Sequence, residues 1–159
     1  MKLEGLGSIP LFAGLSPSQL GRLAKLFEAV VFPAGAPIFT AGDRASRFYV
    51  VRSGEVVIRF HPYDGGSLDL ATIEPGGAFG WSAAFRRASY TSSAVCRTEV
   101  VALTIQADNL HQVMVEDPEF AQGLLEHTGQ LVGSRFNSLG QQVIRKLKPH
   151  QTHTPRRRL

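Results

Sequence analysis

The sequence predicts a mainly β domain with helices flanking the strands. Three observations predict it: a capped helix start at Ser16, short β-branched and aromatic segments between residues 31 and 105, and helical periodicity from residue 107 onward. Strands this short and closely spaced favour a closed or sandwiched antiparallel β structure. With 159 residues, 43% of them hydrophobic and 19% charged, the chain is expected to fold as one ordered domain.

The first helix is predicted from its start signal. Residues 16–19 read Ser-Pro-Ser-Gln, a capping box with proline at the first helical position. Leu20, Leu23 and Phe27 then repeat at helical spacing, so we expect the helix to end near Val31.

The strand segments are rich in valine, isoleucine, threonine and aromatic residues, and glycine, proline, aspartate and serine separate them. They are residues 30–32, 37–40, 48–51, 56–60, 68–73, 92–96 and 100–105.

Two helices are predicted after the strands. A short one begins at Asp108, and a long one begins with Asp117 as N-cap and Pro118 as first helical residue. Apolar residues repeat every seven positions within 117–147, among them Leu125, Val132 and Leu139. Such a stripe is typical of helix pairing, so it predicts a homodimer through this helix.

The domain is expected to span residues 1–148, with the strands at 31–105 and the C-terminal helices at 107–148. Residues 149–159 form a basic tail, which either stays solvated or contacts nucleic acid or anionic lipid. Six of the 17 lysines and arginines follow residue 144, where no acid lies, so the rest of the chain is mildly acidic.

Composition argues against several classes of protein. The single cysteine, Cys96, excludes an internal disulfide framework, and its apolar strand suggests a small core residue. The histidines show no metal-ligand spacing, and no nucleophile–base–acid set is apparent, so we expect neither a metal site nor an enzyme. No apolar run is long enough to span a membrane and no signal-peptide core is present, so a cytoplasmic location is expected.

Three further segments carry a family resemblance. Residues 11–16 read Leu-Phe-Ala-Gly-Leu-Ser, residues 39–56 contain a Gly-Asp turn and a second glycine turn, and residues 75–80 read Pro-Gly-Gly-Ala-Phe-Gly. In this order they resemble the cyclic-nucleotide-binding domain of Crp–Fnr regulators, cyclic-nucleotide-dependent kinases and gated channels. The resemblance covers about residues 11–147. It implies a double-stranded, jelly-roll-like β-roll of eight strands with a long C-terminal helix, and a regulatory role.

The resemblance also implies where a ligand would bind. In the family, a Gly-Glu pair opens a helical turn, the glutamate accepts the ribose 2′-hydroxyl, and an arginine nine residues later pairs with the cyclic phosphate. Here Trp81 stands in the place of the glutamate and Tyr90 in the place of the arginine. Losing one partner of a buried ion pair costs roughly 3–5 kcal/mol, so the usual pose of cAMP or cGMP is doubtful. No cofactor is expected.

The candidate ligand-binding residues come from the segment 79–94. They are Phe79, Gly80, Trp81, Ser82, Ala83, Arg86, Arg87, Tyr90, Thr91, Ser92 and Ser93. An anion could use the N–H groups of the turn and the hydroxyls of Ser92 and Ser93. Arg86 or Arg87 could turn inward to replace the lost cation, or both could be solvated.

The roles of Trp81 and Tyr90, which replace the family's glutamate and arginine, stay open. Trp81 either stacks on a flat ligand or fills the pocket with its indole, and Tyr90 either donates a hydrogen bond to a ligand or simply packs. Arg135 and Phe136 lie about where the family's base-facing residues fall, but Phe136 also belongs to the apolar stripe.

Three functions follow from these alternatives. The leading one is a stand-alone sensor that binds a cyclic nucleotide atypically, or another small anion. The second is a scaffold whose pocket is plugged by Trp81 and Tyr90, and the third is a fragment of a Crp–Fnr transcription regulator. No helix-turn-helix segment follows Lys148 in this sequence, so we do not expect it to bind DNA directly through such a motif.

Overall fold

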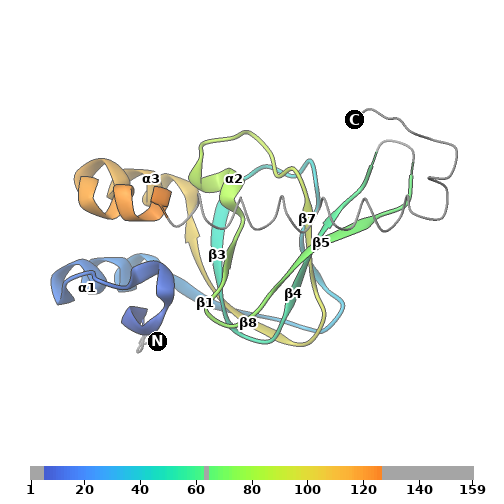
Figure 1. Cartoon of the computed structure of the whole chain (residues 1–159), viewed down its shortest axis with the longest axis horizontal. Coiled ribbons are helices and arrows are strands. Elements are labelled where there is room, and N and C mark those ends of the chain that lie inside the picture. Colours follow the sequence, from blue (N-terminus) through green and yellow to red (C-terminus); the bar gives the residue numbers. More distant parts are fainter. Residues whose placement is uncertain (1–5, 63–64, 127–159) are drawn as a thin grey trace, which may run out of the picture.

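A computed structural model describes residues 6–62 and 65–126, and it places the longer helices at one end of a β-roll (Figure 1). The roll consists of two antiparallel sheets of four strands each, in the orders β1-β8-β3-β6 and β2-β7-β4-β5. This confirms the predicted fold class, mainly β with flanking helices. The strands are β1 Glu28–Phe32, β2 Pro37–Phe39, β3 Arg47–Ser53, β4 Val56–Phe60, β5 Leu68–Ile73, β6 Ala78–Phe79, β7 Ser93–Cys96 and β8 Val100–Gln106. The helices are η1 Leu6–Ser8, η2 Pro10–Phe12, α1 Pro17–Leu26, α2 Trp81–Ala84 and α3 Ala107–Glu116.

Helix α1 begins with the predicted capping box. The Ser16 hydroxyl accepts a hydrogen bond from the Gln19 N–H at 3.1 Å, and the Gln19 side-chain oxygen accepts one from the Ser16 N–H at 2.8 Å. The predicted end near Val31 is wrong, because the helix ends at Leu26. Residues 28–32 instead pair in register with β8, where their β-branched side chains favour extended backbone.

Most predicted strands are present with small changes at their ends. β4 and β5 have the predicted bounds, whereas β1 begins earlier than predicted, at Glu28. β6 was not predicted, because a strand of two residues carries no readable alternation. It pairs with β3 and ends directly before α2, so it determines where the candidate site begins.

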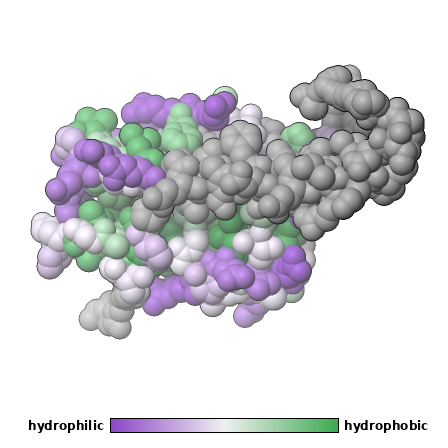
Figure 2. Space-filling model, in the orientation of Figure 1, coloured by the Kyte–Doolittle hydropathy of each residue, from purple (hydrophilic) through white to green (hydrophobic). Residues whose placement is uncertain are grey.

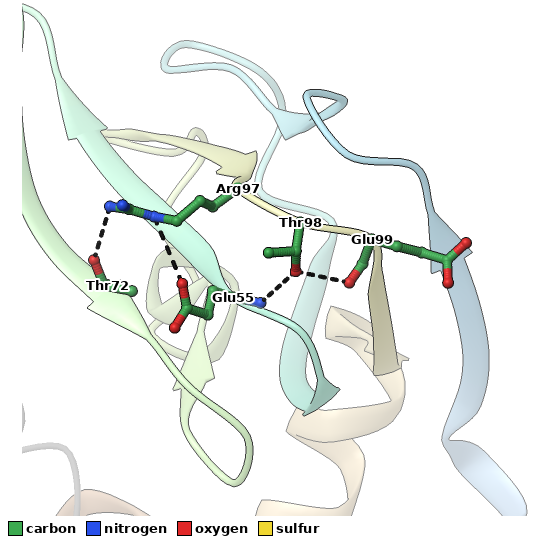
Figure 3. Close-up of polar contacts among 5 residues, drawn as sticks. All are labelled: Glu55, Thr72, Arg97, Thr98 and Glu99. Atoms are coloured by element: carbon green, nitrogen blue, oxygen red, sulfur yellow. Dashed lines mark hydrogen bonds and ion pairs between the residues drawn. The ribbon is translucent and has the colours of Figure 1, made fainter.

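The turn between β3 and β4 packs against the turn between β7 and β8 (Figure 3). The Glu55 N–H donates to Thr98 Oγ1 at 3.1 Å, Thr98 Oγ1 donates to the Glu99 carbonyl at 2.9 Å, and Arg97 Nε lies 3.7 Å from Glu55 Oε1. Gly54 has φ +88°, and a Cβ built there would lie 2.1 Å from the Glu99 carbonyl oxygen. Only glycine therefore fits at position 54, where the β3–β4 turn packs against the β7–β8 turn.

Aromatic packing joins the two ends of the described chain. The ring of Phe12, before α1, lies 5.6 Å from that of Phe27 and 6.5 Å from that of Phe120, measured between centroids. Phe120 follows α3, so the N-terminal and C-terminal helices share one core with the roll. Cys96 is 2% exposed and burial raises the pKa of its thiol, which confirms that it is a small core residue.

The described part of the C-terminal region matches its prediction. Helix α3 begins at Ala107, directly before the predicted start at Asp108. Asp117 caps the helical residues 118–126, since its Oδ1 accepts a hydrogen bond from the Phe120 N–H at 3.1 Å. Among the described residues, none of the helices combines the length and the apolar character needed to cross a bilayer.

Several predictions fall beyond residue 126. The rest of the long helix and most of the apolar stripe proposed for a homodimer, Arg135, Phe136 and the basic tail all lie outside the described residues.

Candidate functional site

The candidate site begins where the chain turns from β6 into α2. Gly80 is the N-cap residue of α2 and has φ +82°, a left-handed conformation. A Cβ at Gly80 would lie 3.0 Å from the Arg47 carbonyl oxygen and 3.2 Å from Tyr49 Cδ1. Both the left-handed backbone and the crowding therefore require glycine at position 80. The missing side chain lets α2 lie close to β3.

Tyr90 is buried and fully engaged with the protein. Its hydroxyl donates to the Arg47 carbonyl at 2.6 Å and accepts from the Arg47 N–H at 3.0 Å. Its ring stacks on Phe39 with centroids 3.6 Å apart and planes 9° apart. Burial is the largest cause that raises the pKa of Tyr90 to about 12, so the phenol is neutral at physiological pH. The residue in the place of the family's arginine thus packs internally.

Tyr90 belongs to an aromatic group between the two sheets. Tyr49 and Phe79 face each other across β3 and β6, and their rings stack with centroids 5.0 Å apart. Phe39, from β2 in the opposite sheet, contacts both of them as well as Tyr90. These rings fill the interior of the roll at the end where α2 lies.

The indole of Trp81 packs on the other face of β3. Its ring lies edge-on to Phe48, with centroids 4.8 Å apart and an interplanar angle of 70°. Phe48 and Tyr49 are successive residues of a strand, so they point to opposite faces of the sheet. The ring lies against Phe48 and Phe85, and Trp81 also lines the small cavity beside Tyr90, so both predicted roles of its indole stay predictions. The buried Nε1 of Trp81 has no hydrogen-bond partner within the described part of the chain.

A small cavity of about 80 Å³ is left beside Tyr90. Pockets for small molecules are usually about 300 Å³ or larger, so with the side chains as they lie here this space is smaller than such a pocket. Six of the predicted site residues line it, together with Phe39 and Ile58: Gly80, Trp81, Ser82, Tyr90, Thr91 and Ser92.

The other predicted residues do not join this cavity. Phe79 belongs to the aromatic group, and Ala83 is buried, with its carbonyl 2.7 Å from His111 Nε2. The Ser93 hydroxyl accepts a hydrogen bond from the Ala41 N–H at 2.9 Å, so it is engaged within the fold.

Arg86 and Arg87 lie on the exposed loop after α2 and do not line the small cavity, so their predicted role toward an anion there stays a prediction. They line a second and larger cavity, of about 550 Å³, with Arg44 and Arg47. Sequence reasoning missed Arg44 and Arg47, although they lie close after the Gly42-Asp43 turn that it did single out.

Comparisons with known proteins agree with this fold. The family model of the cyclic nucleotide-binding domain matches residues 29–117. The "CRP-like cAMP-activated global transcriptional regulator" of Mycobacterium tuberculosis is 31% identical over 141 residues, which cover 89% of this chain and 63% of that protein. The chain therefore spans less than two thirds of that relative's length.

Two solved structures are also similar. A putative cyclic nucleotide-binding protein from Geobacter metallireducens has a TM-score of 0.72 and 26% identity, covering 84% of this chain and 96% of that one. The catabolite activator protein of Thermus thermophilus has a TM-score of 0.73 and 25% identity, covering 85% of this chain and 63% of that one.

The fold and these matches define the class of the protein: the chain belongs to the cyclic nucleotide-binding domain family. Within that family it is a regulatory domain of the Crp–Fnr type.

Proposed function

We propose that this regulatory domain does not hold a cyclic nucleotide in the family's usual pose, and that it acts through contacts with other macromolecules. The observation that carries the proposal is Tyr90, which stands in the place of the phosphate-binding arginine, stacks on Phe39 and is hydrogen-bonded to Arg47. We also propose that the domain has no catalytic role, and its similarity to a transcriptional regulator supports this.

Two energetic costs oppose the usual pose. A phosphate entering beside Tyr90 would have to displace a hydroxyl that makes two hydrogen bonds to Arg47, at about 1–3 kcal/mol for each buried group left unpaired. The phosphate would then lack the guanidinium, a loss of roughly 3–5 kcal/mol. Together these costs exceed about 4 kcal/mol, which corresponds to roughly a thousandfold in affinity or more.

A second candidate function is the sensor that binds a small anion atypically. One observation favours it: the Trp81 Nε1–H is buried and lacks an acceptor among the described residues. Burying such a donor without a partner costs about 1–3 kcal/mol, and a ligand oxygen placed against it would remove that cost. This candidate requires the indole to contact the ligand.

Calorimetric titration distinguishes the two candidates. Wild-type protein should give no binding heat with cAMP or cGMP up to about 1 mM, since the expected loss is roughly a thousandfold. A double variant, Trp81→Glu with Tyr90→Arg, restores the family's glutamate and arginine at these positions. It should bind cAMP at least about tenfold more tightly than the wild type. Ser18→Ala is the control, because Ser18 is exposed on α1 and does not line this cavity.

Two results would contradict the proposal. Micromolar binding of cAMP to the wild type would refute it even if the double variant failed to fold, which thermal unfolding would reveal. Binding that Trp81→Phe weakens about tenfold, while Ser18→Ala leaves it unchanged, would support the sensor instead, because phenylalanine lacks the indole donor.

A further inference from the structure

The larger cavity lies outside the roll, between the loop after α2 and the start of α3. It has a volume of about 550 Å³, within the range of small-molecule pockets. Four arginines line it, and they come from two segments: Arg44 and Arg47 around the start of β3, and Arg86 and Arg87 after α2. Figure 2 shows hydrophilic surface along the top of the molecule, over the loop that joins α2 to β7.

Backbone hydrogen bonds hold these two segments together. The Ala45 N–H donates to the Ala88 carbonyl at 3.0 Å, and the Tyr90 N–H donates to the Asp43 carbonyl at 2.9 Å. Arg44 itself forms an isolated antiparallel bridge with Ser89. The backbone that carries the arginines is therefore fixed by pairing rather than left as two independent loops.

The charge of the cavity is poorly compensated. Within residues 6–62 and 65–126, no carboxylate forms an ion pair with Arg44, Arg86 or Arg87. Arg47 lies 3.6 Å from Glu28, and Asp108 is the one acid on the lining. Four arginines thus line the same space, of which Arg47 is paired with Glu28 and the other three form no ion pair among the described residues.

Arg86 also has an unusual backbone. Its φ is +60°, and no other non-glycine residue of the described chain has a positive φ. Bulky residues seldom adopt this conformation, and it is strained for them. The Arg86 N–H donates to the Ala83 carbonyl at 3.3 Å and the Arg87 N–H to the Ser82 carbonyl at 2.9 Å, so the turn places both side chains on the cavity. Strain of this kind clusters at binding sites.

From this arrangement we propose that the cavity binds a small anion carrying two or more linked phosphate groups. Guanidinium groups form paired hydrogen bonds to phosphate oxygens, and several of them around one space favour multiple charges over one. Among the described residues that line the cavity there is no phenylalanine, tyrosine or tryptophan, and the Nε2 of His111 lies 2.7 Å from the Ala83 carbonyl oxygen, so we expect the phosphate chain to be recognised and a nucleobase not to be stacked. The inference goes beyond the proposed function, because it concerns a site outside the family pocket.

Calorimetry with tripolyphosphate, pyrophosphate, ATP and inorganic phosphate tests this proposal at moderate salt. The wild type should bind tripolyphosphate and pyrophosphate more tightly than inorganic phosphate, and ATP about as tightly as tripolyphosphate. Arg44→Gln and Arg87→Gln should each weaken tripolyphosphate binding about tenfold or more, since each removes charge-assisted hydrogen bonds. Arg59→Gln is the control: it removes the same charge from β4, away from the cavity lining.

Arg86→Gly separates binding from folding. Glycine adopts the φ of +60° without strain, so this variant should keep or raise the unfolding temperature while binding tripolyphosphate about tenfold more weakly. A loss of binding with an unchanged unfolding temperature therefore supports a ligand role for the side chain.

Three results would overturn the proposal. The first is no binding of tripolyphosphate at about 1 mM, the second is an equal loss in Arg59→Gln, and the third is ATP binding far more tightly than tripolyphosphate. Duplex DNA binding that depends on Arg44 and Arg87 in the absence of tripolyphosphate binding would identify a nucleic-acid surface instead. These outcomes do not depend on Tyr90, so they are independent of the cAMP titration.

Discussion

Replacing Tyr90 by phenylalanine is the simplest test of how strongly the Tyr90 hydroxyl is held inside the roll. The ring and its stack on Phe39 are kept, and only the hydroxyl is lost. That hydroxyl makes two hydrogen bonds with the backbone of Arg47, at 2.6 and 3.0 Å. At about 1 kcal/mol for each hydrogen bond, with the Arg47 groups left without their partner, we expect Tyr90→Phe to lower the free energy of unfolding by about 2 kcal/mol. For a chain of this size the melting temperature should fall by roughly 4–8 °C.

Urea unfolding followed by the fluorescence of Trp81 measures this change, because Trp81 is the single tryptophan of the chain and is buried. The control Thr91→Ala alters an exposed neighbour and should stay within about 0.5 kcal/mol of the wild type. A loss below about 0.5 kcal/mol in Tyr90→Phe would refute the reasoning, since it would mean that the hydroxyl is not held by Arg47.

Three further outcomes are expected. The pKa of Tyr90, raised to about 12 from its usual 10, contributes stability below pH 10 that is lost as the pH rises toward 12; alkaline unfolding should show a loss of up to roughly 3 kcal/mol that Tyr90→Phe lacks. Gly54→Ala should destabilise the fold by about 2–4 kcal/mol in thermal unfolding, because its Cβ would meet a carbonyl, whereas Gly35→Ala, with open space around it, should cost about 1 kcal/mol. Ser16→Ala should cost about 1 kcal/mol through loss of the helix cap, and unchanged urea unfolding would contradict the capping role.

Local signals in the sequence predicted much of the fold. The capping box at Ser16 and the β-branched runs of β4 and β5 act within a few residues, and they were predicted correctly. The end of α1 was not, because residues 28–32 continue the apolar pattern of the helix and become a strand only through pairing with β8. Residues 30–32 were also predicted as a strand from their β-branched side chains, but the start of β1 at Glu28 depends on pairing with β8, which is far away in the sequence.

The candidate site was harder to predict for the same reason. The substitutions at positions 81 and 90 could be read from the sequence, and they indicated a changed pocket. The directions of the side chains could not. The Tyr90 hydroxyl bonds to Arg47, which is distant in sequence, and the left-handed turn at Arg86 carries two arginines onto a different surface.

The most direct test of the closed pocket is a titration of the isotope-labelled protein with cAMP, followed by the backbone amide resonances. We predict that the resonances of residues 79–94 stay in place up to about 1 mM cAMP, because the rings of Tyr90 and Phe39 already occupy the interior of the roll. Saturable shifts of Ser82, Tyr90 and Thr91 at micromolar cAMP would show that the pocket opens to the nucleotide, and would contradict the account.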